Sequence, residues 1–357
     1  MRRLARAGVV LAALLLGVLL LGAALGAAGY DAPRALRALW NGSLGSSYAL
    51  TSSTLVRMVP LALTGLAVAL AFRAGVWNIG ADGQLLVGAA CAMAVGLGTT
   101  GFPGSLSLTL ALIAGAVGGG AWAWIAAVLR TRFHVFEVIT TIMLNFIALD
   151  LVAYLVRGPL QEPTHAYPQT VALREAARMP RLLPNSRLHA GLLIAVLAAL
   201  VIWWVLRTTA TGFRIRTAGS NPEAARVAGQ IDVVRLTHRA LVSSGALAGL
   251  AGAIEVTGVT FALYEDISPG YGYTAIAVAL LAGLDPLGVL GAAFLFAALE
   301  SGALAMQREA GVPSVVVAVV EGALILFALV VARPGHRAWM ARSRPQRAVN
   351  RTAESRS

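Results

Sequence analysis

The chain has 357 residues, of which 58% are hydrophobic and only 12% are charged, too little charge to cover the surface of a water-soluble protein. Its 28 basic residues are all arginine, so a lysine-dependent phosphate-binding loop and a lysine Schiff base are excluded. The composition indicates an all-α, multi-pass membrane protein, and the lone cysteine, Cys91, excludes a disulfide framework.

Apolar segments predict a helical bundle with about ten transmembrane helices, within a range of eight to ten. The first run follows three arginines and is longer than the ~7–15 residues of a signal-peptide core. We interpret it as an uncleaved span, with a cleaved signal peptide as the alternative. Further runs cover residues 55–72, 82–98, 106–129, 138–156, 188–206, 239–258, 270–283, 287–306 and 313–332. For 55–72 and 270–283 a partly re-entrant course is the alternative.

The arginines are concentrated in alternate loops and in both tails, which predicts that both termini are cytoplasmic. Residues 1–7 are then a cytosolic N-terminus, 8–332 the membrane domain and 333–357 a basic, disordered cytosolic tail against anionic headgroups. We therefore expect a multi-pass protein of the plasma (inner) membrane. This orientation accounts for the net charge of +12, so nucleic acid is not an expected partner.

Glycines and polar side chains interrupt the apolar sequence between residues 72 and 84. Non-helical backbone at membrane depth is tolerated only where it lines a cavity or is buried in protein. We interpret the segment, with one asparagine from the span at 138–156, as part of a substrate pathway. The candidates are Trp77, as an apolar platform, and Asn78, Asp82, Gln84 and Asn145 as polar contacts. A tight cytosolic hairpin with Arg73 at the headgroups is the alternative.

Single acidic residues occur in several predicted spans. A charge in the middle of a membrane costs ~2.5 kcal/mol or more, so it usually faces the bundle interior or a transport pathway. For isolated acids we favour hydrogen bonds to neighbouring helices, with proton relay as the alternative. Glu137 is expected to begin a helix at the interface; the others are Asp150, Glu255, Glu300 and Glu321, of which Glu321 is the deepest by sequence.

The polar, proline-rich residues 157–187 predict an external loop, with a short helix at Thr170–Ala177. The sequence GLDPLG at 283–288 predicts either a tight turn or the end of a short half-helix. Aromatic residues before it predict an outer interface belt, with stacking on a ligand as the alternative; they are Phe261, Tyr264, Tyr271 and Tyr273.

A polar island, TAGSNPEAARVAG at 217–229, lies within the predicted cytosolic loop 207–238. Asn221 is a suitable cap and Pro222 a suitable first residue, so the pattern predicts a short helix that begins there. Such a helix in a cytosolic loop is what a membrane protein needs to receive force from a soluble partner. The residues expected to do so are Glu223, Ala224, Ala225 and Gly229; an ordinary capped turn is the alternative.

Four motifs, in this order, resemble those of a known family: RAGVWNIGADGQLLVGA at 73–89, EVITTIMLNFIA at 137–148, GFRIRTAGSNPEAARVAGQ at 212–230 and GLDPLG. From about residue 50 to 332 the chain resembles the permease subunits of bacterial ABC importers, in the branched-chain amino acid, simple sugar and nucleoside class. Within that class, NIGADGQ at 78–84 and GPLQEPTHAYPQT at 158–170 resemble the nucleoside-type permeases.

The resemblance implies that this chain translocates a nucleoside or related sugar by alternating access and is not an enzyme. It implies no cofactor on this chain, with ATP bound by a separate ABC ATPase that docks on Glu223, Ala224, Ala225 and Gly229. The other implied partners are a second homologous permease subunit, a substrate-binding lipoprotein, the small-molecule substrate and the lipid bilayer. The I-x-L-P ending of many such coupling loops is missing here, where His238 and Arg239 stand.

Two other functions compete with this one. A proton-coupled secondary transporter of a small polar solute would use Glu321, Glu300 or Glu255. An integral-membrane enzyme would need a paired Asp-rich motif, a zinc-type histidine cluster or a nucleophile elbow, and the sequence has none of these. For the substrate, Trp77, Asn78, Gln84 and Asn145 offer the stacking surface and amide partners that a nucleoside needs, while a pentose remains open.

Overall fold

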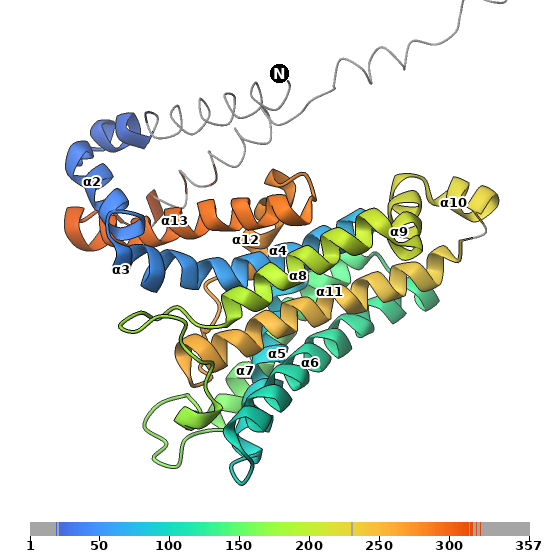
Figure 1. Ribbon diagram of the computed structural model, residues 1–357, viewed down its shortest axis with the longest axis horizontal. Coiled ribbons are helices and arrows are strands. Elements are labelled where there is room, and N and C mark those ends of the chain that lie inside the picture. The colour runs from blue at the N-terminus through green and yellow to red at the C-terminus, as the bar shows by residue number, and fades with distance from the viewer. Residues whose placement is uncertain are drawn as a thin grey trace, which may run out of the picture.

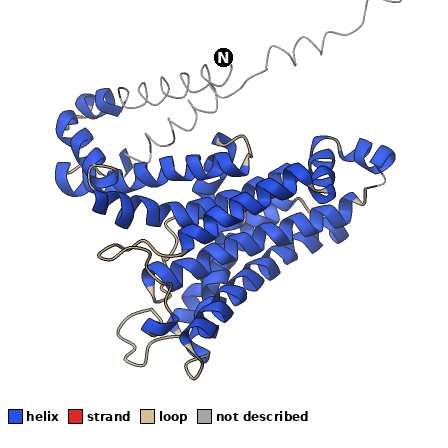
Figure 2. Ribbon diagram, viewed as in Figure 1, coloured by secondary structure: helices blue, strands red, loops and turns tan. Residues whose placement is uncertain are grey.

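The computed structural model describes residues 21–229 and 231–313 and the single positions 19, 315, 316, 319 and 322. Within this part of the chain helices account for nearly all regular structure, and no strand is present beyond two isolated bridges (Figure 2). The predicted all-α class is therefore confirmed. The N-terminal segment 1–7, most of the first and last predicted spans, Glu321 and the tail 333–357 lie outside the described residues.

Seven helical stretches are long and apolar enough to cross a membrane, and they confirm seven of the predicted spans. In chain order the elements are α2 (Ala32–Ser43), α3 (Ser47–Ala49), η1 (Leu50–Thr54), α4 (Leu55–Arg73), α5 (Ala81–Gly98), α6 (Gly104–Phe133), α7 (Glu137–Arg157), η2 (Glu175–Ala177), α8 (Gly191–Thr208), α9 (Ala210–Ser220), α10 (Pro222–Gly229), α11 (Val233–Glu255), η3 (Val256–Thr260), α12 (Tyr271–Leu281) and α13 (Pro286–Ala310). The span predicted at 55–72 is confirmed and its re-entrant alternative is excluded, because α3, η1 and α4 form one helical stretch, Ser47–Arg73. Among the predicted spans that the structure describes in full, α12, with 11 residues, is too short to cross a membrane.

Helix α4 is the centre of the bundle and packs against α8, α11, α12 and α13. On another side α5, α6 and α11 meet along a seam of glycines, where backbone touches backbone. A Cβ atom on Gly249 would lie 2.2 Å from the carbonyl oxygen of Gly115, and one on Gly88 would lie 2.3 Å from the Cα of Gly249. Small residues allow this approach between membrane helices, so the seam fixes the spacing of three spans.

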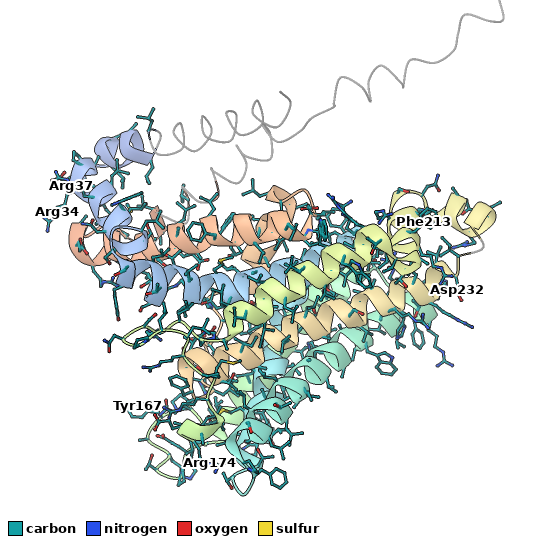
Figure 3. The ribbon with its side chains drawn as sticks, viewed as in Figure 1. Arg34, Arg37, Tyr167, Arg174, Phe213 and Asp232 are labelled. Atoms are coloured by element: carbon teal, nitrogen blue, oxygen red, sulfur yellow. The ribbon has the colours of Figure 1, made fainter. Side chains whose placement is uncertain are left out.

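The two ends of the bundle differ in character. Helices α9 and α10 project at one end, and the loop between α7 and α8 lies at the other (Figure 1). Figure 3 shows Phe213 and Asp232 at the first end and Tyr167 and Arg174 at the second. Of the helix expected at Thr170–Ala177, only the 3₁₀ turn Glu175–Ala177 forms.

The loop between α7 and α8 avoids a longer helix because its backbone bonds to the segment that follows α11. Thr170 N donates to Leu263 O at 2.9 Å, and Leu173 N donates to Phe261 O at 2.7 Å. Met179 N donates to Thr257 O at 2.8 Å. The loop is therefore fixed to η3 and to the residues that follow it, at the C-terminal end of α11.

The glycine seam yields a stability prediction. Replacing Gly249 with Ala should lower the apparent melting temperature of the detergent-solubilised protein by several degrees, because overpacking costs about 1–3 kcal/mol. Gly291→Ala in α13 is the matched control, since nothing lies within 4 Å of its added Cβ. Thermal unfolding followed by size-exclusion chromatography measures both; equal melting temperatures would contradict the seam's role.

Candidate functional site

Helix α10 begins where the sequence predicts. The side-chain oxygen Oδ1 of Asn221 accepts a hydrogen bond from Ala224 N at 3.0 Å, Pro222 is the first helical residue and Gly229 the last. Glu223 and Ala224 are exposed, whereas Ala225 is fully buried in a cluster with Ala218 of α9 and Ile231. Glu223 and Ala224 thus lie on the exposed surface of α10, together with Arg226 and Val227, while Ala225 packs α10 against α9.

Helix α9 in turn touches the end of α4 through glycine. A Cβ atom on Gly219 would lie 2.0 Å from the carbonyl oxygen of Arg73, and one on Gly75 would lie 3.2 Å from the Cα of Gly219. Gly75 has a φ of +76°, which favours glycine. Arg73 also donates from Nε to Leu284 O at 3.1 Å, in the turn between α12 and α13. The short helices therefore rest directly on the start of the 73–84 segment.

The chain from residue 74 to 80 is not helical, and Asn78 holds it inside the bundle. Nδ2 of Asn78 donates to Gln84 Oε1 at 2.9 Å and to Ser244 Oγ at 2.8 Å. Its Oδ1 accepts from Gly80 N and from Gln84 Nε2, both at 3.0 Å. Asn78 and Gln84 are buried, as expected for a segment inside the protein rather than a hairpin in the cytosol.

Asn145 of α7 and Asp82 of α5 complete this arrangement. Asn145 accepts from Gly83 N at 2.8 Å and donates to Ile79 O at 2.9 Å and to Tyr273 OH at 3.1 Å. Asp82 Oδ1 accepts from Ser268 Oγ at 2.8 Å and from Gly272 N at 2.9 Å. We call the four buried side chains of Asn78, Asp82, Gln84 and Asn145 the polar junction; it ties α5 to α7, α11 and α12.

Trp77, the fifth predicted pathway residue, stands apart from the junction. Its side chain is 53% exposed and its ring lies against Phe72, with centroids 4.7 Å apart. Its backbone N–H donates to Glu137, which pairs with Arg130 and begins α7 as expected. The structure therefore brings four of the five candidates together, and their hydrogen bonds are largely to one another and to backbone.

A cavity of about 460 Å³ lies towards the other end of the bundle. We call it the outer cavity. Its lining includes Arg57 of α4, Arg187 of the α7–α8 loop, Glu255, Asp266 and two tyrosines, Tyr264 and Tyr271. Along α11, Glu255 is about 33 Å from Val233, at ~1.5 Å per residue, so the cavity is far from α10.

Sequence reasoning missed this cavity because its residues are far apart in the chain. Arg57, a lone basic residue at the start of an apolar span, was the available signal, since such a charge usually marks a pathway or a partner. Tyr271, expected in an interface belt, is 6% exposed and faces the cavity instead. Burial and the nearby Glu255 raise the pKa of Tyr264, which also lines it.

Glu255 differs from the other acids. It is 5% exposed, yet its carboxylate accepts no hydrogen bond from any residue that the structure describes. The positive charges of Arg57 and Arg187 act on it across the cavity. The interpretation that isolated acids bond to neighbouring helices is therefore wrong for Glu255. Asp150, by contrast, is exposed on α7.

Two π-helical turns form part of the cavity wall. Ser52 and Ser53 belong to η1, and Val259 and Thr260 belong to η3. Turns of this kind are rare and occur often at functional sites.

His189 lies two residues after Arg187 in the chain. Burial and the charge of Arg187 lower the pKa of His189 to about 4, so this ring adds no positive charge near pH 7.

Metal chemistry has no support among the described residues, because they contain no group of three or more His, Cys, Asp or Glu side chains placed to hold an ion.

A second, smaller cavity of about 320 Å³ lies near the α9 end of the bundle. Its lining includes Arg73, Arg207, Arg216 and Asp285.

Comparison with known proteins supports a transport role. Residues 50–329 match the family described as "Branched-chain amino acid transport system / permease component". The chain is 41% identical over 318 residues to the guanosine ABC transporter permease protein NupP of Bacillus subtilis, covering 87% of this chain and 90% of NupP. It is 39% identical over 328 residues to the glucose ABC transporter permease protein TsgB13 of Haloferax volcanii, covering 89% and 84%.

A more distant relative comes from the same organism as NupP. This is the guanosine ABC transporter permease protein NupQ of Bacillus subtilis, 27% identical over 256 residues, covering 70% of this chain and 80% of NupQ. No solved structure matches the chain.

The polar junction predicts a specific loss of stability. Asn78→Ala leaves Gln84, Ser244 and Gly80 N without their partner, and each buried unsatisfied group costs about 1–3 kcal/mol. The apparent melting temperature should fall by about 5 °C or more. Asn41→Ala, on the exposed face of α2, should leave it unchanged. Similar shifts for both variants would show that the junction does not hold the segment.

Proposed function

The chain belongs to the family of branched-chain amino acid transport system permease components, and on that premise we propose that it imports a nucleoside by alternating access, powered by a separate ATPase. It is a multi-pass membrane protein and a permease component. The observation that carries the proposal is the pair α9–α10, which presents Glu223 and Ala224 outward and rests on Gly75 and Arg73 inward.

The contacts offer a route for force from α10 into the bundle. Ala225 fixes α10 to α9, and Gly219 of α9 touches the backbone at Arg73. From Gly75 the extended chain leads to the polar junction, which holds α5, α7, α11 and α12 together. A push on α10 would thus move several helices as one body, the rigid-body motion expected of alternating access.

A second permease subunit is the proposed partner within the membrane. The most apolar stretches of α7 and α8 are only 28% and 22% buried, so much of their surface faces outward. Asp150 lies on α7, and a charged side chain that faces lipid is costly. A neighbouring permease against α7 would cover it. NupP and NupQ, two guanosine permease proteins of one organism, are consistent with a heterodimer.

The remaining assembly follows from the two ends of the bundle. We place the ABC ATPase, with its ATP, against α10, and the substrate-binding lipoprotein against the α7–α8 loop. The chain itself needs no cofactor in this scheme. Guanosine, in the name of NupP, makes a nucleoside the preferred substrate, with a sugar as the alternative because TsgB13 is named for glucose.

A proton-coupled transporter remains the second candidate, because Glu255 lines a cavity and accepts no hydrogen bond from any described residue. Proteoliposomes that contain the permeases, the ATPase and the binding protein separate the two. With ATP present and proton gradients abolished, guanosine uptake should continue. Uptake that stops with the gradient while ATP is held constant would favour the proton-coupled function.

Coupling through α10 is tested by charge reversal. Glu223→Arg should reduce co-purification of the ATPase and ATP-driven guanosine uptake by roughly 10-fold or more. The reason is that a reversed charge meets a like charge of the partner, and two like charges side by side in an interface cost several kcal/mol. Glu309→Arg, at an exposed glutamate in the last turn of α13, is the matched control and should change neither. Normal uptake by Glu223→Arg would exclude α10 as the docking helix.

Transmission from α9 is tested separately. A side chain at Gly219 must displace the backbone of Arg73, so Gly219→Val should leave ATPase binding intact while guanosine uptake falls by about 10-fold. Gly98→Val, at the end of α5 where nothing lies within 4 Å of an added Cβ, controls for the substitution itself. If both variants transport equally, force does not pass through this contact.

A further inference from the structure

We propose that the outer cavity binds the vicinal hydroxyl groups of the solute, with Glu255 as their acceptor and with Arg57 and Arg187 beside it. The inference rests on the proposed import function and assigns substrate selection within the membrane to this site. The ligand class is an uncharged ring with hydroxyl groups on adjacent carbons, such as the ribose of a nucleoside.

The charges of the cavity favour an uncharged ligand. Two arginines, Arg57 and Arg187, and two acids, Glu255 and Asp266, contribute the formal charges of its lining, which therefore sum to zero. His189 beside Arg187 is neutral, because its pKa is lowered to about 4. Because the lining has no net formal charge, it offers a phosphorylated solute no net attraction, whereas an uncharged nucleoside needs none. The volume of about 460 Å³ falls within the ~300–1,000 Å³ of small-molecule sites.

Glu255 is the group that needs a ligand. A carboxylate has two oxygens, which accept hydrogen bonds and donate none. Glu255 is 5% exposed as a residue and lines the cavity, and no described residue donates a hydrogen bond to its carboxylate. No nitrogen of Arg57 or Arg187 forms an ion pair with it, although both charges act on it. Two hydroxyl groups on adjacent ring carbons can supply the two missing donors, as an acidic side chain does for ribose in dinucleotide sites.

The remaining walls suit a flat or ring-shaped solute. Tyr264 and Tyr271 provide aromatic surface, and the hydroxyl groups of Ser52, Ser53 and Thr260 come from the two π-helical turns. The relatives named for guanosine and for glucose are similarly close to this chain, and both of those solutes carry vicinal hydroxyls. A diol site explains how one scaffold serves both.

The cavity also adjoins the polar junction. Ile267 and Pro269 line it, and Ser268 between them donates to Asp82. Tyr271, another lining residue, is next to Gly272, whose N–H donates to the same carboxylate oxygen. A bound diol would therefore contact the segment through which the junction meets α12.

The test compares guanosine with 2′,3′-dideoxyguanosine in proteoliposomes that contain the whole transporter and internal ATP. Each uptake rate is divided by the binding protein's own measured occupancy for that compound, so that only selection by the membrane part remains. We expect the corrected rate for the dideoxy compound to be at least about 10-fold lower, because a site built for hydroxyl groups rejects analogues that lack them.

Glu255→Gln keeps the size of the side chain but replaces one acceptor oxygen with a donor. It should bring the corrected ratio to within about 3-fold, mainly by slowing guanosine. Glu309→Gln, at an exposed position of α13, should keep the wild-type ratio. The apparent melting temperature of each variant shows whether it is folded.

Two results would overturn the inference. One is a wild-type corrected ratio near one, which needs no variant; the other is a folded Glu255→Gln protein that discriminates as well as wild type. In both cases ATP-driven guanosine uptake would still uphold the import function. Absence of ATP-driven uptake in wild type would instead refute that function. If the folded Glu255→Gln protein keeps that discrimination while both of its uptake rates are strongly reduced, Glu255 acts as a proton-relay acid and not as a diol acceptor.

Discussion

Backbone that leaves the helix inside a membrane must find its hydrogen bonds within the protein, and this constraint governs the arrangement around residues 74–80. Asn78 and Asn145 meet it directly, because their amides bond to Gly80 N, Gly83 N and Ile79 O. Each amide also reaches a second helix, through Ser244 or Tyr273. The bonds that make the break tolerable therefore also join the helices around it, so the break cannot shift without moving them.

Glycine serves two mechanical purposes in this fold. In the seam of α5, α6 and α11 the close contacts repeat along the helices, where Gly249 meets Gly88 and Gly115 and, one turn away, Gly245 meets Gly119, so these three spans pack as a rigid unit. At the end of α4 the contact is local, where Gly219 of α9 meets Arg73 and Gly75. A local contact transmits a push but lets α9 tilt, whereas a repeated contact resists sliding. The two kinds of contact suit a rigid bundle moved from one end.

The sequence predicts most of what depends on local chemistry. The cap at Asn221, the helix it begins and seven spans follow from residues close together in the chain, and the structure confirms them. The burial of Asn78 and Gln84 was also predictable, because glycines flank them. The direction of Ala225 was not, since it depends on Ala218 and Ile231. Nor was the outer cavity: Arg57, Arg187 and Glu255 meet only through tertiary packing, and no short pattern connects them.

The separation of charges in the outer cavity bears on how a transporter can release what it binds. If Arg57 or Arg187 formed a direct ion pair with Glu255, the carboxylate would be satisfied and would have little affinity for hydroxyl groups. Held apart across the cavity, the charges leave Glu255 open while their field offsets part of the cost of burying it. A motion of α11 relative to α4 that brought Arg57 nearer to Glu255 would replace the solute as the partner of the carboxylate. Because the polar junction ties α11 to the segment on which α9 rests, such a motion and the proposed push on α10 can be one event.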